Sequence, residues 1–322
     1  MKLVVQYLLV LFINVSVFAS SVEATPKKVW IDTDIIFDVF GKDVDDGVAL
    51  MLALNNPDIE IVGISVVHNV AHAKEVTEKI LKYYAEYDIP VYLGQDDASK
   101  SYGSTSPAVE ALAAALEQDS LAVLALGPAT NIANLLKFYP EQTKKITDIV
   151  FCAGRTKGNV FRPKSARKNL PDYNFELDSA SFQYLLEKGS LNIILAGYEA
   201  AAPIFIYKSD LKKLKERNNP GDNWVFRKLR NWHFGWRVAL GVDGFIPFDV
   251  ATVGAIIYPE FFTIEDQGVE INYRENDSYF LIKADKKNYL EVVDGAESKY
   301  SIRYVVETDS TYKNFIVNKL FN

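Results

Sequence analysis

Four aspartates near the start of the chain have the residue type and spacing for chemistry. Asp32 and Asp34 follow a short apolar run, and Asp45 and Asp46 precede another. An aspartate at a helix start can cap free N–H groups, but capping accounts for only one of the four. Carboxylates this close repel one another unless a cation neutralises them. Hard oxygen ligands suit Ca²⁺ or Mg²⁺ rather than Zn²⁺, and the scarcity of His and Cys agrees with a hard-cation site.

The elements that must position these aspartates alternate in a regular order. Residues 29–31 are typical of a buried strand, and residues 46–55 are typical of an apolar helix. Ligands of open α/β sheets bind at the carboxyl ends of the strands, which is where Asp32 and Asp34 are expected. Further strands are expected at 59–67, 89–93, 121–126, 149–153 and 191–196, and further helices at 72–87, 107–118, 131–139 and 180–188.

The pattern changes after about Pro259. Alternating residues at 279–282 and 301–306, with an Asp-Gly turn signal between them, favour antiparallel strands. A last helix is expected near 312–320, and the charged run at 212–217 fits a solvated helix face. The predicted fold class is α/β: a Rossmann-like open, mostly parallel twisted sheet flanked by helices, with a C-terminal antiparallel β extension.

Composition excludes several classes of protein. The 322 residues are 49% hydrophobic, which is enough for a core and argues against a disordered chain. The 35 Lys and Arg against 42 Asp and Glu give a net charge of −7, so no nucleic-acid polymer is expected as a partner. The single cysteine excludes a disulfide scaffold.

The N-terminal segment is typical of a secretory signal peptide. Met1 and Lys2 precede an apolar run over residues 3–18 and then small residues. We expect a signal peptide over residues 1–24, with cleavage near 19–24. The alternative is a membrane anchor, but the run is a little short for a span and no basic cluster follows it. The expected product is an exported protein, periplasmic or secreted, with no stable membrane span and one domain over residues 25–322.

Two families share an Asp-x-Asp signature after their first strand. Phosphatases of the haloacid dehalogenase type usually have Thr or Val where this chain has Ile36, and their motif does not account for Asp45 and Asp46. The sequence instead resembles the inosine-uridine preferring nucleoside hydrolase family, which opens with Asp-x-Asp, a short glycine-containing loop, Asp-Asp and a helix rich in Ala and Leu. Residues 32–35 and 41–46 match this motif, with an apparent insertion at 36–40 between them.

Later segments resemble the same family in the same order. Together they cover nearly the whole mature chain to about residue 260, and several ordered motifs are far more specific than one. They are a strand ending in Asn at 64–69, a Leu-Gly-Pro-x-Thr-Asn turn at 126–131, a Gly-Asn pair at 158–159 followed by 172–178, and Phe-Asp-x-x-Ala at 248–251.

The resemblance implies a calcium-dependent hydrolase that cleaves ribonucleosides to free base and ribose, as in purine and pyrimidine salvage. Ca²⁺ would be held by Asp34, Asp46, the main-chain oxygen of Leu126 and Asp249. Asp34 would also deprotonate the attacking water, and Asp32 would orient the loop. The implied substrate contacts are Asp45, Asn69, Asn159, Asp172, Asn174, Phe248 and Asp249.

Three features depart from the family pattern. Asp172 stands where Glu is usual, so its reach is one methylene shorter. The basic segment 160–171 is longer than expected, and is either a solvated surface loop, which we favour, or a lid over the substrate. Phe248 replaces a His that can protonate the leaving base, and either packs in the core or stacks on the base, which would favour purines. The aromatic residues Trp224, Trp232, Phe234 and Trp236 are expected mostly in the core, with one or two near the base.

Other functions remain open at this point. The chain could be an exported protein that binds calcium and ribose without catalysis, or a hydrolase of another N-riboside. The expected partner is a small-molecule nucleoside, and the resemblance allows a homo-oligomer. His68 is near enough to Asn69 to approach the site, whereas Cys152 is expected to be a buried small apolar residue rather than a nucleophile.

Overall fold

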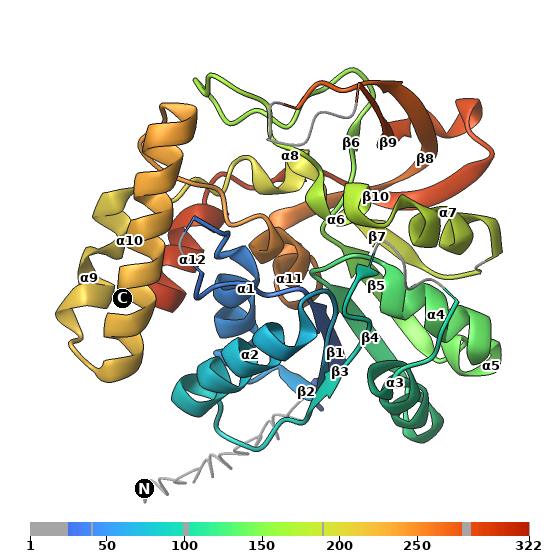
Figure 1. Cartoon of the computed structure of the whole chain (residues 1–322), viewed down its shortest axis with the longest axis horizontal. Helices are drawn as coiled ribbons and strands as arrows, with labels where there is room; N and C mark the ends of the chain where they lie inside the picture. The colour runs from blue at the N-terminus through green and yellow to red at the C-terminus, as the bar shows by residue number, and fades with distance from the viewer. Residues whose placement is uncertain (1–24, 40, 99–102, 189, 279–284, 322) are drawn as a thin grey trace, which may run out of the picture.

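The chain builds one twisted sheet with helices on both faces (Figure 1). The structure is a computed structural model that describes residues 25–39, 41–98, 103–188, 190–278 and 285–321. Within these ranges the strand order is β3-β2-β1-β4-β5-β7-β10-β8-β9-β6. The strands are β1 (Lys27–Thr33), β2 (Ile59–Val66), β3 (Val91–Leu93), β4 (Leu121–Ala125), β5 (Ile146–Phe151), β6 (Arg155–Thr156), β7 (Ile193–Leu195), β8 (Phe262–Glu275), β9 (Lys286–Val293) and β10 (Tyr300–Thr308).

The sheet changes direction in its C-terminal part. Strands β3, β2, β1, β4, β5, β7 and β10 run parallel, whereas β8 is antiparallel to both β10 and β9. The predicted α/β class and its antiparallel C-terminal extension are therefore confirmed. The predicted strand at 279–282 and the predicted signal peptide lie outside the described residues, so both stay predictions.

The helices form two layers, and alternate residues of each strand serve one layer or the other. On β1, Val29 and Ile31 share one buried cluster with residues of α1, α10 and α11, whereas Trp30 shares the other with residues of α3 and α4. The α-helices are α1 (Asp45–Leu54), α2 (Val70–Tyr84), α3 (Pro107–Gln118), α4 (Thr130–Phe138), α5 (Pro140–Thr143), α6 (Tyr173–Leu177), α7 (Ser179–Lys188), α8 (Tyr198–Ala201), α9 (Lys212–Glu216), α10 (Pro220–Leu240), α11 (Asp249–Ile257) and α12 (Tyr312–Phe321). Short 3₁₀ helices are η2 (Lys208–Leu211), η3 (Pro259–Phe261) and η4 (Gly295–Glu297).

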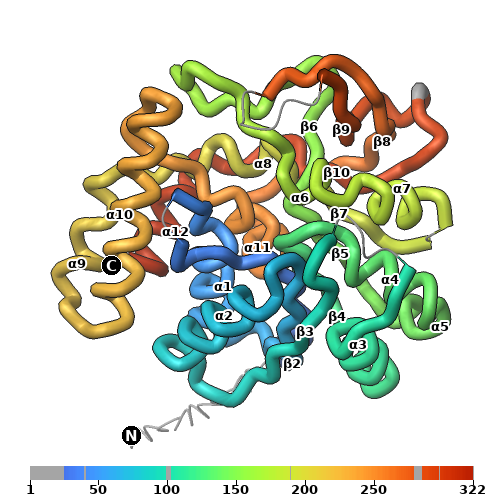
Figure 2. The backbone as a smooth tube through the Cα atoms, viewed as in Figure 1, coloured from blue at the N-terminus to red at the C-terminus, as the bar shows by residue number. Residues whose placement is uncertain are grey.

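The C-terminal helix of the described chain is tied to the layer that holds α1 and α9. Helix α12 lies beside α1 and α9 (Figure 2), where Asn55 donates to the Lys319 carbonyl at 2.9 Å and Arg217 donates to the Leu320 carbonyl at 3.0 Å. No helix in the described ranges is both long enough and apolar enough to cross a bilayer.

Candidate active site

Three carboxylates gather where α1 begins, beside the carboxyl end of β1. Ligand oxygens of Asp43, Asp45 and Asp46 lie within 4.8 Å of one another. The Thr33 hydroxyl donates to Asp46 and so joins the strand end to the helix. Sequence reasoning assigned no role to Asp43, although its place in an acidic run before a helix was an available signal.

Asp34 and Asp249 reach this cluster from opposite ends of the chain. Burial, followed by the charges of Asp43 and Asp45, raises the pKa of Asp34 well above its ordinary value. Burial, followed by the charges of Asp45 and Asp46, raises the pKa of Asp249 in the same way. The structure therefore brings together four of the aspartates singled out from the sequence, namely Asp34, Asp45, Asp46 and Asp249.

This cluster has the donor set of a hard cation. Asp249 is 2% exposed, and its Oδ1 atom has no hydrogen-bond partner among the described residues. A buried anionic oxygen without a donor is unfavourable unless a positive charge compensates it. The surrounding carboxylates offer oxygen alone, which fits a hard divalent cation.

A tight turn after β4 brings a main-chain carbonyl to the same edge of the sheet. The Leu126 carbonyl accepts a hydrogen bond from Asn174 at 2.5 Å, and Asn174 also donates to the Cys152 carbonyl at 3.1 Å. A Cβ on Gly127 would lie 2.9 Å from the Asp34 nitrogen. Only glycine allows the β4 turn to approach the Asp34 backbone so closely.

Asp172 is the residue before the first turn of α6, and its carboxylate accepts a hydrogen bond from the main chain. Its Oδ2 atom accepts from the Gly154 N–H at 2.8 Å, and burial raises its pKa to about 7. The half-buried Cys152 lies near both Asp172 and Asp249, and burial followed by the charge of Asp249 raises the pKa of its thiol. Cys152 was expected to be a buried small apolar residue rather than a nucleophile; it is half-buried, and its raised pKa favours the neutral thiol over the nucleophilic thiolate.

Asp32 is completely buried, and its side chain accepts hydrogen bonds from helix α4 and strand β2. Asn131 donates to its Oδ1 at 2.8 Å, and the Ser65 hydroxyl donates to the same atom. Trp30 in turn donates to Ser65 at 2.8 Å. Burial, partly opposed by the bonds from Asn131 and Ser65, raises the pKa of Asp32 to about 7. This network fixes the strand ends that carry the site.

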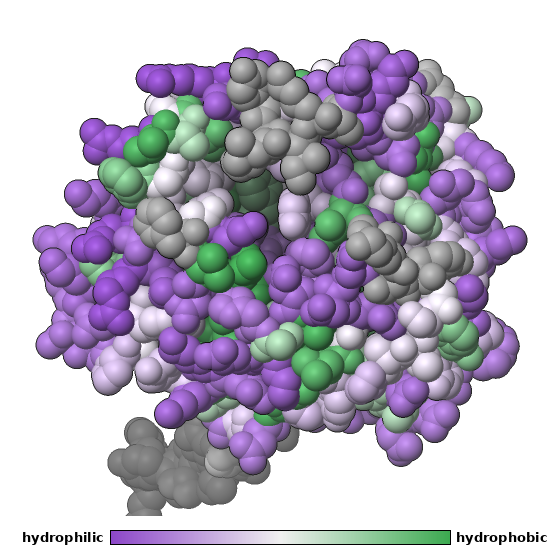
Figure 3. Space-filling model, viewed as in Figure 1, coloured by the Kyte–Doolittle hydropathy of each residue, from purple (hydrophilic) through white to green (hydrophobic). Residues whose placement is uncertain are grey.

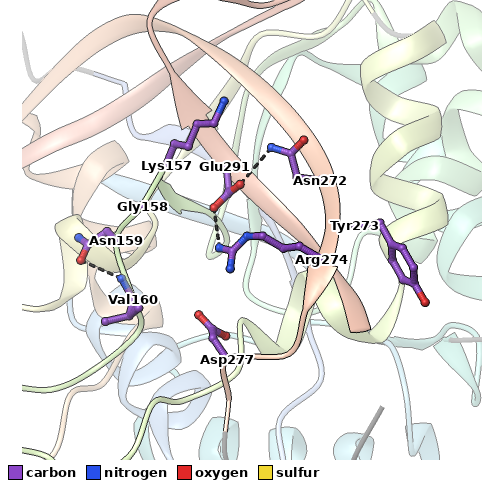
Figure 4. A pocket seen from close by; sticks show the side chains of 9 residues that line it. All are labelled: Lys157, Gly158, Asn159, Val160, Asn272, Tyr273, Arg274, Asp277 and Glu291. Carbon is purple, nitrogen blue, oxygen red and sulfur yellow. Dashed lines mark hydrogen bonds and ion pairs between the residues drawn. The ribbon is translucent and has the colours of Figure 1, made fainter. Parts of the chain in front are cut away.

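Asn159 lies in a separate depression beside the β8–β9 ribbon. Its Nδ2 donates to Glu199 at 2.6 Å, and its Oδ1 accepts from Val160 at 2.9 Å. Figure 4 shows Asn159 and Val160 on one side of a cavity of about 540 Å³, with Arg274 reaching Glu291 on the other. The contacts of the described residues join Asn159 to Glu199 and not to the acidic cluster.

Asn69 stands at the N-terminus of α2 in a strained loop. It and His68 both adopt a left-handed backbone, with φ of 51° and 59°, a region that non-glycine residues rarely enter. The Asn69 side chain is exposed, and its backbone N–H donates to the Asp96 carbonyl at 3.0 Å. Burial lowers the pKa of His68, so this half-buried imidazole favours its neutral form.

Aromatic rings line up near the start of α11. Phe248 is partly buried and lies 6.0 Å from Phe161, which lies 5.1 Å from Tyr198. Phe161 belongs to the basic segment 160–171, whose Arg167 N–H donates to the Leu240 carbonyl at 3.0 Å. Figure 3 shows one face of the molecule, which is hollowed near its centre and has apolar surface visible inside the hollow. Of the other aromatic residues, Trp224 and Trp236 are buried, Trp232 is partly buried and Phe234 is 58% exposed.

The described chain thus combines a mostly parallel α/β sheet with a cluster of aspartates at the carboxyl ends of its strands. The sequence model described as inosine-uridine preferring nucleoside hydrolase matches residues 29–311. The chain therefore belongs to the inosine-uridine preferring nucleoside hydrolase family, which confirms the resemblance seen in the sequence.

Curated relatives are ribonucleoside hydrolases. The chain is 24% identical over 265 residues to the pyrimidine-specific ribonucleoside hydrolase RihA of Klebsiella pneumoniae, covering 70% of this chain and 80% of that protein. It is 26% identical over 290 residues to a probable uridine nucleosidase 2 of Oryza sativa. That match covers 76% of this chain and 80% of the rice protein.

Solved structures share the fold. A plant nucleoside hydrolase, PpNRh1, gives a TM-score of 0.71 at 19% identity, covering 92% of this chain and 98% of that one. A purine-preferring ribonucleoside hydrolase from Gardnerella vaginalis gives a TM-score of 0.69 at 17% identity. The match covers 91% of this chain and 98% of that one. This similarity supports the confirmed fold class.

Proposed function

We propose that the protein is a calcium-dependent ribonucleoside hydrolase that releases a free base and ribose. The observation that carries this proposal is the buried Oδ1 atom of Asp249, which lies near the first-loop carboxylates and has no hydrogen-bond partner in the described part of the chain. Asp34, Asp46, Asp249 and the Leu126 carbonyl would hold the ion. Oxygen ligands alone support Ca²⁺ over softer metals. When bound, the ion would lower the pKa of a coordinated water and hold the ribose hydroxyls.

Asp34 is the proposed general base. It would take the proton of the water that attacks the anomeric carbon, as the new C–O bond forms and the C–N bond to the base breaks. The electron pair of that C–N bond leaves with the base, which must gain a proton from another donor. Phe248 carries no exchangeable proton, so no acid is assigned at that position.

The remaining polar groups would stabilise positive charge on the sugar. Cleavage passes through an oxocarbenium-like state, which nearby anionic and amide oxygens stabilise more than they stabilise the bound nucleoside. Asp45 is proposed for this role because it lies in the acidic cluster. Asn174 and Asp172 are proposed at the neighbouring α6 edge. Asn69 and Asn159 remain proposed sugar contacts, and both would need to turn toward the substrate from their present positions.

For the leaving base we propose a purine preference. The row formed by Phe248, Phe161 and Tyr198 supports it, because a two-ring base offers more surface for stacking than a one-ring base. The names of the relatives point both ways, since RihA is called pyrimidine-specific and the Gardnerella enzyme purine-preferring.

One assay tests both the reaction and the ion. Inosine, adenosine, guanosine, uridine and cytidine are incubated with the protein, and released reducing sugar is measured with and without a chelator. Release that stops with chelator and returns with Ca²⁺ supports the proposal. Ribose binding without release would instead support a binding protein, and faster release from uridine than from every purine nucleoside would refute the purine preference.

Export and assembly are further proposals. The apolar run after Lys2 supports a cleaved signal peptide, which N-terminal mass spectrometry of the protein from its native compartment would test. A homo-oligomer is proposed from the family resemblance, and light scattering of the purified protein would test it.

A further inference from the structure

The insertion between the two halves of the acidic motif is anchored in the core. Phe37 is 1% exposed and packs on Gly47 of α1, where a Cβ would overlap its ring. On its other side the Phe37 ring lies 5.2 Å from the Trp224 ring of α10. The Phe37 side chain thus packs between α1, which carries Asp45 and Asp46, and α10.

The next residue, Asp38, provides a second anchor because it forms ion pairs with two helices. Asp38 pairs with Lys79 of α2 at 3.2 Å and also with Lys228 of α10. Lys228 additionally donates to the Asp38 carbonyl at 3.0 Å. Burial raises the pKa of Asp38, but hydrogen bonds and charge from Lys228 and Lys79 outweigh it and leave the pKa below its ordinary value.

The two anchors also reinforce each other. The Lys79 ammonium lies 4.4 Å from the centre of the Trp224 ring that Phe37 contacts. Asp38 is 26% exposed on its side chain and Lys228 is 24% exposed, so the Asp38–Lys228 pair is partly shielded from water. A shielded pair with two partners holds its geometry better than a solvated one.

We propose that Phe37 and Asp38 are positioning residues that hold Asp34 and the Asp43–Asp46 group at the separation that the metal needs. This inference rests on the proposed function. The carboxylates on either side of the insertion repel one another when no ion is present. A loop that is already fixed loses little conformational entropy when the ion binds, so the anchors raise metal affinity.

The test compares Ca²⁺ affinity by calorimetry in the mature protein and two variants, Lys228→Met and Asp38→Asn. Positioning predicts that both variants weaken Ca²⁺ binding, by about tenfold. Simple long-range charge predicts opposite signs, because removing a lysine charge would strengthen cation binding and removing an aspartate charge would weaken it. Lys212→Met is the matched control and should bind as wild type, because Lys212 is exposed on α9 and pairs with Glu216 of the same helix.

A second measurement does not depend on the metal. In chelator-treated protein, amide hydrogen exchange at residues 36–45 should be faster in Lys228→Met than in wild type, and unchanged in Lys212→Met. Unchanged exchange or unchanged Ca²⁺ affinity in Lys228→Met would overturn the positioning role. If wild type binds no Ca²⁺ while Lys228→Met speeds the exchange, the proposed function fails and the anchor itself stands.

Discussion

The Thr33 hydroxyl donates a hydrogen bond to the Asp46 carboxylate and so couples the last residue of β1 to the first turn of α1. This bond links the carboxyl end of β1 directly to the helix that carries Asp45 and Asp46. The acidic cluster is built on this junction, with Asp34 on its strand side and Asp45 on its helix side.

Replacing Asp249 by Asn should have opposite effects on the empty and the loaded protein. Without metal, the variant removes a buried charge that Asp45 and Asp46 repel, so its melting temperature should rise. With Ca²⁺, the variant should lose at least about 100-fold in affinity and most of the stabilisation that the ion gives wild type. Melting curves with chelator and with Ca²⁺ measure both effects. A variant that Ca²⁺ still stabilises like wild type would remove Asp249 from the ligand set.

The metal-free protein should lose stability as the pH rises. The folded pKa values of Asp32 and Asp172 are about 7, above the unfolded value of about 3.9. At these two groups the folded state therefore binds more protons between these values, so their contribution to the free energy of unfolding is highest below about pH 4 and falls through about pH 7. Urea unfolding of chelator-treated protein at a series of pH values measures this slope.

The variant Asp32→Asn tests how much Asp32 contributes to the pH dependence of stability. The amide keeps an oxygen for Asn131 and Ser65, while the Asp32 Oδ2 position has no partner to lose among the described residues. The pH dependence should be shallower in this variant. An identical slope would show that Asp32 does not titrate in this range.

Gly127→Ala should destabilise the fold, whereas Gly235→Ala should not. The new Cβ would lie 2.9 Å from the Asp34 nitrogen and 3.0 Å from Val67 Cγ1, so the β4 turn must move, at a cost of about 1–3 kcal/mol. Gly235→Ala in α10 meets no atom within 4 Å and should gain up to about 1 kcal/mol from helix propensity. Urea unfolding of the two variants should therefore change in opposite directions.

The basic segment 160–171 should behave as a docked surface loop. Phe161 and Ala166 are buried, whereas Lys164 is exposed. Trypsin should cut after Lys164 at the same rate with and without a ribose analogue. Protection of this bond by the analogue would instead support a lid.

The regular part of the fold could be predicted because local signals and packing agree there. The helix at 107–118 has Ser106 as its N-cap and Pro107 at its first position, and α3 has these bounds. The predicted helix at 72–87 was wrong by a few residues, because α2 begins after the left-handed Asn69 and ends at Tyr84.

Helix α10 was missed because its sequence carries mixed signals. Gly221 and Gly235 weaken its helical propensity, and charged residues interrupt its aromatic ones. Its N-cap Asn219 and its C-terminal Gly241, with φ of 77°, are the signals that could have found it. Asp34 and Asp46 could be predicted because both belong to a short motif that is recognisable in the sequence. The bond from Asn159 to Glu199 joins residues 40 positions apart and depends on tertiary packing alone.

Strand β10 lies between β7 and β8, so the most C-terminal of the described strands joins the parallel and antiparallel parts of the sheet. A nascent chain on the ribosome cannot complete this sheet until residues beyond 300 have emerged. A product truncated before β10 would leave an open edge on β7, which is a template for aggregation. Completion of the sheet thus depends on residues 300–308, which lie far along the chain from the first acidic loop.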